Sequence, residues 1–202
     1  MSTPEQRNIA YARGQSDLPG WCGDILPWQQ WAQKYIPHGG TYVEIGTFLG
    51  ASLAHMGTIR PDIQLVAIDP WLDGKSQGYD GPGEYAAYVE GRGGLWLAFL
   101  KTMIEHAPDV LKRTRIIRGT SKLVYMPKAA DVVFIDGAHD RASVLDDLAE
   151  AQMWTKPGGL ISGHDYSPDF QGVIDATTES FGSVSRGIPG TTESQACWWV
   201  ET

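Results

Sequence analysis

Short apolar runs alternate along the chain with segments in which apolar residues recur every three or four positions. The short runs predict strands, and they cover residues 41–45, 64–69, 115–118, 131–136 and 160–162. The spaced segments predict helices, at residues 50–60, 95–106, 142–154 and 170–181. The centre of 131–136 is apolar without interruption, which is typical of a parallel strand buried on both faces. The alternation predicts a doubly wound α/β sheet with helices on both faces.

Three regions fall outside this alternation. Residues 196–200 predict a last strand, preceded by a loop that begins at Gly187. Residues 26–36 lie in an aromatic-rich segment, 1–40, and predict a helix that either caps the binding side of the sheet or packs in the core. The connection 72–95 is rich in glycine and polar residues, so it is either a lid or a surface insertion.

Length and composition favour one soluble domain, 1–202, that acts on a small molecule. A chain of 202 residues with 42% hydrophobic residues is long enough for one good core and short for two domains. The net charge of −8 offers no basic field for a nucleic-acid backbone or an anionic membrane. Cys22 and Cys197 suggest neither a disulfide framework nor a metal site. We see no signal peptide or membrane span, and we therefore expect a cytoplasmic protein.

A glycine turn joins the strand at 41–45 to the helix at 50–60, and its sequence is Glu44-Ile-Gly46-Thr47-Phe48-Leu-Gly50. A dinucleotide site needs a second glycine where this chain has Phe48, so a bound pyrophosphate is not expected. The spacing of Glu44, Gly46 and Gly50 resembles the first motif of class I S-adenosylmethionine-dependent methyltransferases. Their cofactor carries an adenosine and a sulfonium but no phosphate.

Other positions at the ends of the strands fit such a cofactor. Asp69 follows Gly46 by about the spacing of ribose-binding acids, and it ends the next strand. Backbone amides near Gly50 and Ser52 open a helix, where they can hold the carboxylate of the methionine half. Beyond the strand at 115–118, Thr120 and Ser121 either border the adenine or cap the following segment. The predicted cofactor-binding residues are Glu44, Gly46, Thr47, Gly50, Ser52, Asp69, Thr120, Ser121 and Asp136.

Two further motifs narrow the resemblance. Asp136-Gly-Ala-His139 ends one strand, and a Pro-Gly-Gly turn leads through the next strand to His164-Asp165-Tyr166. Together they resemble a subgroup of small-molecule O-methyltransferases that includes macrolide sugar methyltransferases and cephalosporin hydroxylase-like proteins. The resemblance spans roughly residues 41–166. It implies a Rossmann-like, mostly parallel sheet of seven strands that closes with an antiparallel pair.

The same resemblance implies roles for the reacting side. By position, Asp136 and Asp165 become metal ligands and His139 becomes the general base that takes a proton from the acceptor hydroxyl. The chain departs from the pattern at His164, where the sugar enzymes have a carboxylate, so the all-oxygen set preferred by Mg²⁺ is incomplete. We therefore predict a metal site of Asp136, His164 and Asp165 that suits Mg²⁺ or Mn²⁺, with Fe²⁺ and Zn²⁺ left open.

The sequence thus predicts an S-adenosylmethionine-dependent O-methyltransferase for a hydroxylated small molecule such as a sugar or a secondary metabolite. Two other functions stay open on the same fold: a metal-dependent hydroxylase or hydrolase, and a non-catalytic cofactor-binding protein. The site residues also have purely structural interpretations, in which Asp136 caps a turn, His139 binds Asp165 and His164 stacks under the cofactor. A homodimer is compatible with the aromatic residues, which a single core would accommodate equally well.

Overall fold

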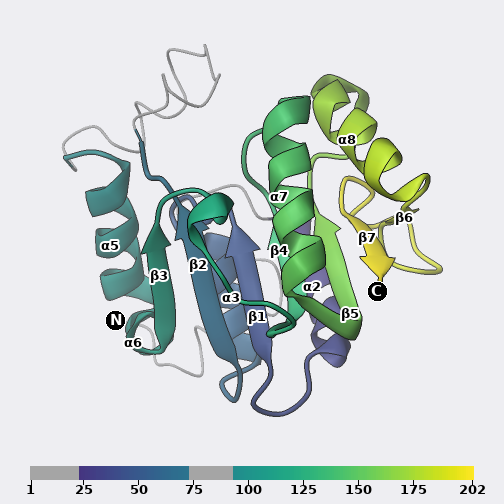
Figure 1. Ribbon diagram of the computed structural model, residues 1–202. Coiled ribbons are helices and arrows are strands. Elements are labelled where there is room, and N and C mark those ends of the chain that lie inside the picture. Colours follow the sequence, from purple (N-terminus) through teal and green to yellow (C-terminus); the bar gives the residue numbers. More distant parts are fainter. Residues whose placement is uncertain (1–22, 73–92) are drawn as a thin grey trace.

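The computed structural model describes residues 23–72 and 93–202, which form one seven-stranded sheet between two layers of helices (Figure 1). The strand order is β3-β2-β1-β4-β5-β7-β6. The first five strands in this order run parallel, and β7 runs antiparallel to both β5 and β6. This confirms the predicted fold class. The strand bounds are β1 Thr41–Ile45, β2 Gln64–Asp69, β3 Thr114–Arg118, β4 Ala130–Ile135, β5 Thr155–Gly163, β6 Ser185–Arg186 and β7 Trp198–Glu201.

The register of the central strands brings the predicted motifs to one edge of the sheet. Val43 of β1 lies beside Val66 of β2 on one side and Val133 of β4 on the other. The strand order therefore reverses between β1 and β4, and ligands of open α/β sheets bind at such a reversal, beyond the carboxyl ends of the strands. The glycine turn after β1, Asp69 at the end of β2 and Asp136 after β4 all lie at this edge.

Alternate residues of the strands face two different helix layers, as the pleat of a strand requires. One layer contains α2 (Ile25–Ala32), the 3-10 turn η1 (Gln33–Tyr35), α3 (Ala51–Ile59), α5 (Leu95–His106) and α6 (Pro108–Lys112). The other contains α7 (Arg141–Trp154) and α8 (Gln171–Phe181), with the short turns η3 (Ser121–Leu123) and η4 (Pro168–Phe170) nearby. Tyr42 of β1 packs in the first layer and Val43 in the second.

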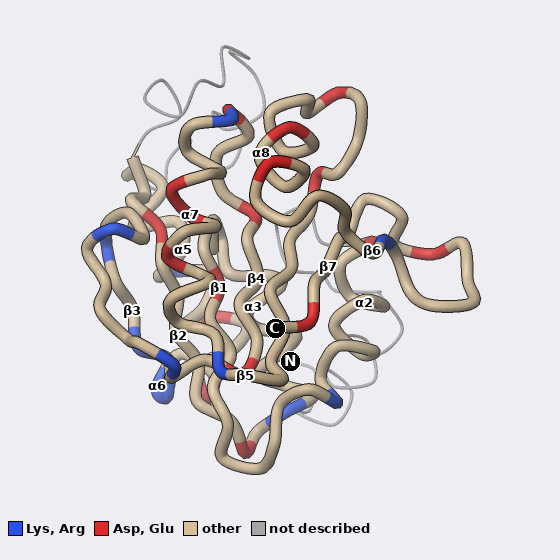
Figure 2. Tube along the Cα trace, turned by 45° about the vertical axis from the view of Figure 1, so that its right-hand side comes forward, with Lys and Arg blue, Asp and Glu red and all other residues tan. Residues whose placement is uncertain are grey.

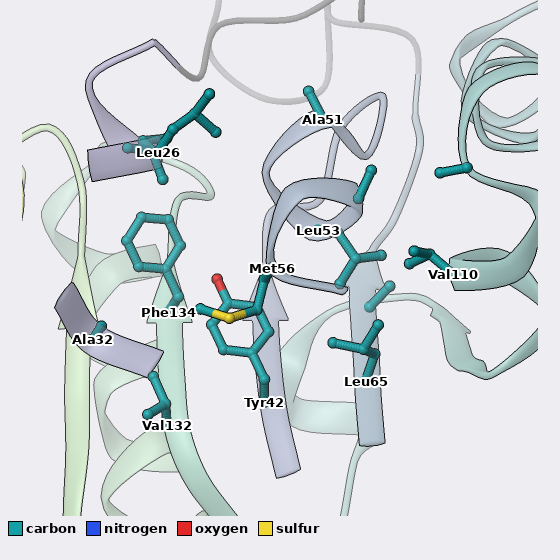
Figure 3. Close-up of a cluster of buried hydrophobic side chains, with 14 of the residues drawn as sticks. Leu26, Ala32, Tyr42, Ala51, Leu53, Met56, Leu65, Val110, Val132 and Phe134 are labelled. Atoms are coloured by element: carbon teal, nitrogen blue, oxygen red, sulfur yellow. The ribbon is translucent and has the colours of Figure 1, made fainter. Parts of the chain in front are cut away.

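The core of the first layer includes the helix that the sequence predicted at 26–36. Phe134 of β4, Tyr42 of β1 and Met56 of α3 lie close together beneath α2 (Figure 3). Trp28 of α2 is fully buried, and its ring lies 4.9 Å from that of Phe134. Such an aromatic pair contributes about 0.5–1.5 kcal/mol beyond its burial. The α-helical part ends at Ala32 and packs in the core, whereas residues 1–22 and most of the predicted lid, 73–92, lie outside the described residues.

Three elements differ from the sequence prediction. Strand β5 begins at Thr155, before the Pro-Gly-Gly turn signal, because the end of β7 pairs with it and Gly158 donates to the carbonyl of Thr202. Helix α6 is a single short turn that starts at Pro108, a residue favoured at the first helical position. Strand β6 has only two residues, too few for a periodic signal. No helix among residues 23–72 and 93–202 has the length and apolar character needed to cross a membrane.

Candidate active site

The glycine turn after β1 lies in close contact with the segment that follows β4. Gly46 has a φ of +87°, a conformation that side chains rarely adopt. A Cβ atom at this position would also lie 2.0 Å from the backbone oxygen of Asp136. Gly50 has a φ of +86°, and a Cβ there would meet the sulfur of Met103 at 2.6 Å. Glycine is therefore required at both positions, and Gly46 holds the turn directly against Asp136.

The carboxylate of Asp69 is oriented by two backbone donors. The N–H of Phe48 donates to Oδ2 at 2.8 Å, and the N–H of Trp71 donates to Oδ1 at 2.6 Å. Burial raises the pKa of Asp69, and the hydrogen bonds from Phe48 and Trp71 act in the opposite direction. Each carboxylate oxygen can accept a second hydrogen bond. Asp69 is therefore fixed at the wall of the cleft with capacity left for two hydroxyl groups.

A cleft of about 750 Å³ lies along this edge of the sheet, within the range of small-molecule sites. Its walls come from the glycine turn, the end of β2, the segment after β3, the turn after β4 and the start of α7. It brings together six of the predicted site residues: Gly46, Asp69, Thr120, Ser121, Asp136 and His139. The described walls do not include the other predicted residues, namely Glu44, Thr47, Gly50, Ser52, His164 and Asp165.

Glu44 lies behind the glycine turn, in a closed cluster of polar side chains. Its carboxylate accepts hydrogen bonds from the hydroxyl groups of Tyr42 at 3.1 Å and Ser52 at 2.9 Å. Gln29 donates to the Tyr42 hydroxyl at 3.1 Å and its amide oxygen lies 2.7 Å from Nδ1 of His55. Burial, together with the charge of Asp136, raises the pKa of Glu44 to about 8, against the hydrogen bonds from its two donors. The side chain has no exposed surface, so this geometry fits support of the turn better than direct contact with a cofactor.

Ser121 is held by Asp147, a buried carboxylate of α7. Its Oγ donates to Oδ1 of Asp147 at 2.6 Å, and both residues line the cleft. Burial raises the pKa of Asp147 to about 6. Asp147 lies on the sheet-facing side of α7, which the spacing of Val144, Leu148 and Ala151 would have revealed.

The residues after β4 and β5 form a chain of imidazoles and carboxylates. Nε2 of His139 lies 2.8 Å from Oδ2 of Asp165. The other oxygen of Asp165 lies 3.1 Å from Nδ1 of His164, which is also 3.8 Å from Oδ1 of Asp136. Nε2 of His164 lies 2.7 Å from Oδ2 of Asp24, at the start of α2. Asp165 has a φ of +60°, a strained conformation for a residue other than glycine that occurs preferentially at functional sites.

These contacts separate the pKa values of neighbouring groups. Burial raises the pKa of Asp136 to about 7, although the His164 charge acts against it. The pKa of Asp165 is lowered despite burial, because His139 and His164 both donate to it. Burial would lower the pKa of His164, but the hydrogen bonds to Asp165 and Asp24 and the nearby carboxylates raise it to about 11. Two adjacent carboxylates with opposed shifts are typical of a site that handles protons.

The same cluster fits a divalent cation. One ligand atom each of Asp136, His139 and Asp165 lies within 4.8 Å of the others. His164, which the sequence predicted as a ligand in place of His139, presents Nδ1 to the same two carboxylates. Carboxylate oxygens and imidazole nitrogens are the donors that divalent metal sites use. Asp136 and Asp165, together with an imidazole of His139 or His164, would hold such an ion.

Sequence reasoning missed two residues that fix His139. The ring of Phe170, in η4, lies 4.3 Å from the His139 ring and lines the cleft. Gly172 opens α8 against the turn that carries His139, and a Cβ there would lie 2.3 Å from the His139 backbone oxygen. A lone aromatic and a lone glycine at the start of a helix carry no signal in one sequence. Only the packing of α8 against the turn reveals them.

Comparison with known proteins agrees with this geometry. A family model described as a methyltransferase domain matches residues 43–166. A candidate rRNA methylase from Clostridium thermocellum covers 88% of this chain and 96% of its own, with 12% identity and a TM-score of 0.60. The O-methyltransferase TomG from Streptomyces achromogenes, solved in complex with S-adenosylmethionine, covers 98% and 90%, with 16% identity and a TM-score of 0.57.

CalS11, a TDP-rhamnose 3′-O-methyltransferase of calicheamicin biosynthesis, covers 100% of this chain and 96% of its own, with 15% identity and a TM-score of 0.53. No curated protein matches the chain in sequence. At these identities the solved structures show the fold alone, whereas the family model covers more than half of the chain. The protein therefore belongs to the methyltransferase domain family and is a class I S-adenosylmethionine-dependent methyltransferase.

Proposed function

We propose that the protein transfers a methyl group to a hydroxyl group of a small molecule, with His139 as the general base. The observation that carries this proposal is the position of His139. It lines the cleft beside Asp136 and is backed by Asp165, at 2.8 Å. A carboxylate behind an imidazole fixes the ring and stabilises its protonated form. A hydroxyl nucleophile needs such a base, because it is weak until its proton is removed.

The cofactor side of the cleft has a matching set of groups. We assign Asp69 to the two ribose hydroxyls, Thr120 and Ser121 to the adenine edge, and Gly46 to the backbone that lets the cofactor approach Asp136. S-adenosylmethionine supplies a methyl group on a positively charged sulfur. The acidic walls of the cleft favour that charge. Alignment of methyl group and hydroxyl in one cleft contributes most of the rate, up to about 7–11 kcal/mol in favourable cases.

Proton transfer follows from the contacts of His139. Asp165 accepts the Nε2 proton of His139, which leaves the lone pair of the neutral ring on Nδ1. The acceptor hydroxyl gives its proton to this nitrogen as the methyl group is transferred, and Asp165 stabilises the resulting imidazolium. We further propose that Asp136 and Asp165 would hold a divalent cation, whose charge would lower the pKa of the acceptor hydroxyl.

Charge restricts the acceptor to an uncharged or cationic molecule. Within the described part of the cleft, the walls carry five carboxylates, Asp69, Asp136, Asp140, Asp146 and Asp147, and one lysine. That lysine, Lys122, is paired with Asp146 at 2.6 Å. Acidic positions also gather along α7 and α8, whereas basic ones lie along β3 and α6 (Figure 2). These charges disfavour a phosphate-bearing acceptor, including a nucleic acid.

Calorimetry with S-adenosylhomocysteine and a methyl-donor assay test the proposal. We expect the wild-type chain to bind S-adenosylhomocysteine and Asp69→Ala to bind it at least about 100-fold more weakly, because two hydrogen bonds to a charged group are lost. Asp62→Ala, a half-buried residue paired with Arg60 and outside the described cleft walls, is the matched control. A panel of neutral, cationic and phosphorylated hydroxyl compounds then tests the acceptor. Absence of cofactor binding, or preferred methylation of the phosphorylated compounds, contradicts the proposal.

A further inference from the structure

We propose that His164 is a nitrogen ligand of the metal site, that Asp24 orients it, and that the site therefore selects a divalent transition ion over Mg²⁺. The inference rests on the metal site of the proposed function and assigns residues and ion class within it. Its basis is the pair of contacts at the two nitrogens of His164. One nitrogen faces the carboxylates of the site, and the other binds a carboxylate outside it.

The two histidines of the cluster have different positions. His139 lines the cleft, where an acceptor hydroxyl would lie, whereas His164 is outside the described cleft walls. Nδ1 of His164 lies 3.1 Å from Asp165 and 3.8 Å from Asp136, on the side of the carboxylates. His139 can therefore exchange protons with an acceptor. His164 is placed to bind an ion shared by the two carboxylates.

Asp24 supplies the outer contact that metal-bound histidines usually have. Its Oδ2 lies 2.7 Å from Nε2 of His164, so it accepts the proton on that nitrogen and holds Nδ1 toward Asp136 and Asp165, where an ion would replace the Nδ1 proton. Asp24 occupies the first position before α2, where an aspartate normally caps its own helix, yet its side chain makes no such bond. Here the side chain binds His164 and leaves its own helix uncapped.

The position of Asp24 is fixed by its surroundings. Helix α2 follows it directly and is anchored in the core by Ile25 and Trp28, both of which are buried. On the other side, the hydroxyl of Ser194 donates to the backbone oxygen of Asp24. The residue thus reaches His164, 140 positions away in sequence, from a rigid support.

The donor set decides the class of ion. Mg²⁺ prefers oxygen ligands throughout and a nearly ideal octahedron, whereas imidazole nitrogen suits later first-row ions. Two carboxylates and an oriented imidazole therefore favour an ion such as Fe²⁺, Co²⁺ or Zn²⁺. The competing explanation is that Asp24 and His164 form only a structural ion pair between α2 and the end of β5. In that case neither residue affects metal affinity.

Calorimetry of the metal-free full chain with CoCl₂ and MgCl₂ separates the two explanations. We expect Asp24→Ala to weaken Co²⁺ binding about 10- to 100-fold, and Asp24→Asn, which keeps an acceptor, to recover part of the loss. Asp109→Ala, an exposed aspartate paired with Lys112, is the matched control and should leave Co²⁺ affinity unchanged. His164→Asp, which restores oxygen donors, should lower the ratio of Co²⁺ to Mg²⁺ affinity at least about tenfold.

Unchanged Co²⁺ affinity in Asp24→Ala or an unchanged ion ratio in His164→Asp overturns the inference. Binding of S-adenosylhomocysteine is measured in the same samples. A chain that binds S-adenosylhomocysteine but no ion overturns the inference and leaves the methyltransferase function intact, whereas a chain that does not bind S-adenosylhomocysteine contradicts the proposed function itself.

Discussion

Two polar clusters lie on either side of the glycine turn, and they use similar residues in different ways. The inner cluster consists of Gln29, Tyr42, Glu44, Ser52 and His55. The cleft cluster consists of Asp24, Asp136, His139, His164 and Asp165. Each contains at least one carboxylate and one imidazole, and both join α2 to the sheet. The inner cluster is sealed, with every member buried, whereas the cleft cluster is partly exposed.

The difference shows what separates a supporting polar group from a reacting one. In the inner cluster, the hydrogen-bond partners of Glu44 are two hydroxyl groups, and burial moves its pKa in one direction. In the cleft cluster, burial raises the pKa of Asp136 to about 7, whereas hydrogen bonds from His139 and His164 lower the pKa of Asp165. Neighbouring groups held in different protonation states are equipped to pass a proton on. Hydrogen-bonded burial without such partners mainly fixes structure.

Loss of the base should give the largest effect. We expect His139→Gln to lower kcat about 10²- to 10⁴-fold, the range that general base catalysis contributes. Binding of S-adenosylhomocysteine should stay within a few-fold of wild type, because His139 faces the acceptor side of the cleft in our assignment. Single-turnover methyl transfer and calorimetry measure the two quantities. A variant that keeps wild-type kcat would show that the cleft cluster does not act as a base.

The inner cluster should affect how the free energy of unfolding depends on pH. Because the folded pKa of Glu44 is about 8 and its ordinary value is 4.5, the folded chain keeps this proton longer than the unfolded chain. The contribution of Glu44 is therefore complete below pH 4.5 and is lost as the pH rises through about 8.

Glu44→Gln removes this dependence. Relative to wild type, the free energy of unfolding of the variant should increase by about 3 kcal/mol between about pH 5.5 and 8.5, because the dependence is about 1.4 kcal/mol per pH unit between the two pKa values. Urea unfolding at the two pH values measures it. The neighbouring carboxylates Asp69 and Asp136, whose charges contribute to the raised pKa of Glu44, are present in both proteins. An equal pH dependence in both would place Glu44 in a charged, solvated site, as a direct cofactor contact would require.

A substitution next to the backbone of His139 should have an intermediate effect on kcat. Gly172→Ala forces a Cβ atom toward the His139 carbonyl, and either α8 or the turn must move. Such overpacking costs about 1–3 kcal/mol in well-packed regions. We expect kcat to fall about tenfold while the affinity for S-adenosylhomocysteine is unchanged. Gly23→Ala is the matched control, because a Cβ there meets nothing within 4 Å. Equal kinetics for the two variants would remove α8 from the positioning of His139.

The sequence was sufficient to predict which residues lie at the strand ends, but not which hydrogen-bond partners the side chains of the site have. Gly46, Asp69, Asp136 and His139 were found because a parallel sheet brings the carboxyl ends of its strands to one edge. The orientation of Glu44 was not predictable, because it depends on Ser52 of α3, which reaches Glu44 only once α3 packs against β1. The contact made by Asp24 was even less predictable. Its contact with His164 depends on α2 folding across β4, which no local pattern encodes.

The smallest effect is expected when a serine of the inner cluster, Ser52, is compared with a serine of the cleft, Ser121. The comparison tests whether only the serine that lines the cleft contacts the cofactor. Ser52 and Ser121 both donate to a buried carboxylate, but Ser121 lines the cleft and Ser52 does not. Removing either hydroxyl leaves a carboxylate short of a donor, so both Ser52→Ala and Ser121→Ala should lower the free energy of unfolding by about 1–3 kcal/mol. Ser121→Ala should also weaken S-adenosylhomocysteine binding about fivefold, the equivalent of about 1 kcal/mol, whereas Ser52→Ala should not. Thermal unfolding measures the loss of stability in the two variants, and calorimetry measures their affinity for S-adenosylhomocysteine. Equal losses of that affinity would place Ser52 in the cofactor site and contradict the supporting role assigned to the inner cluster.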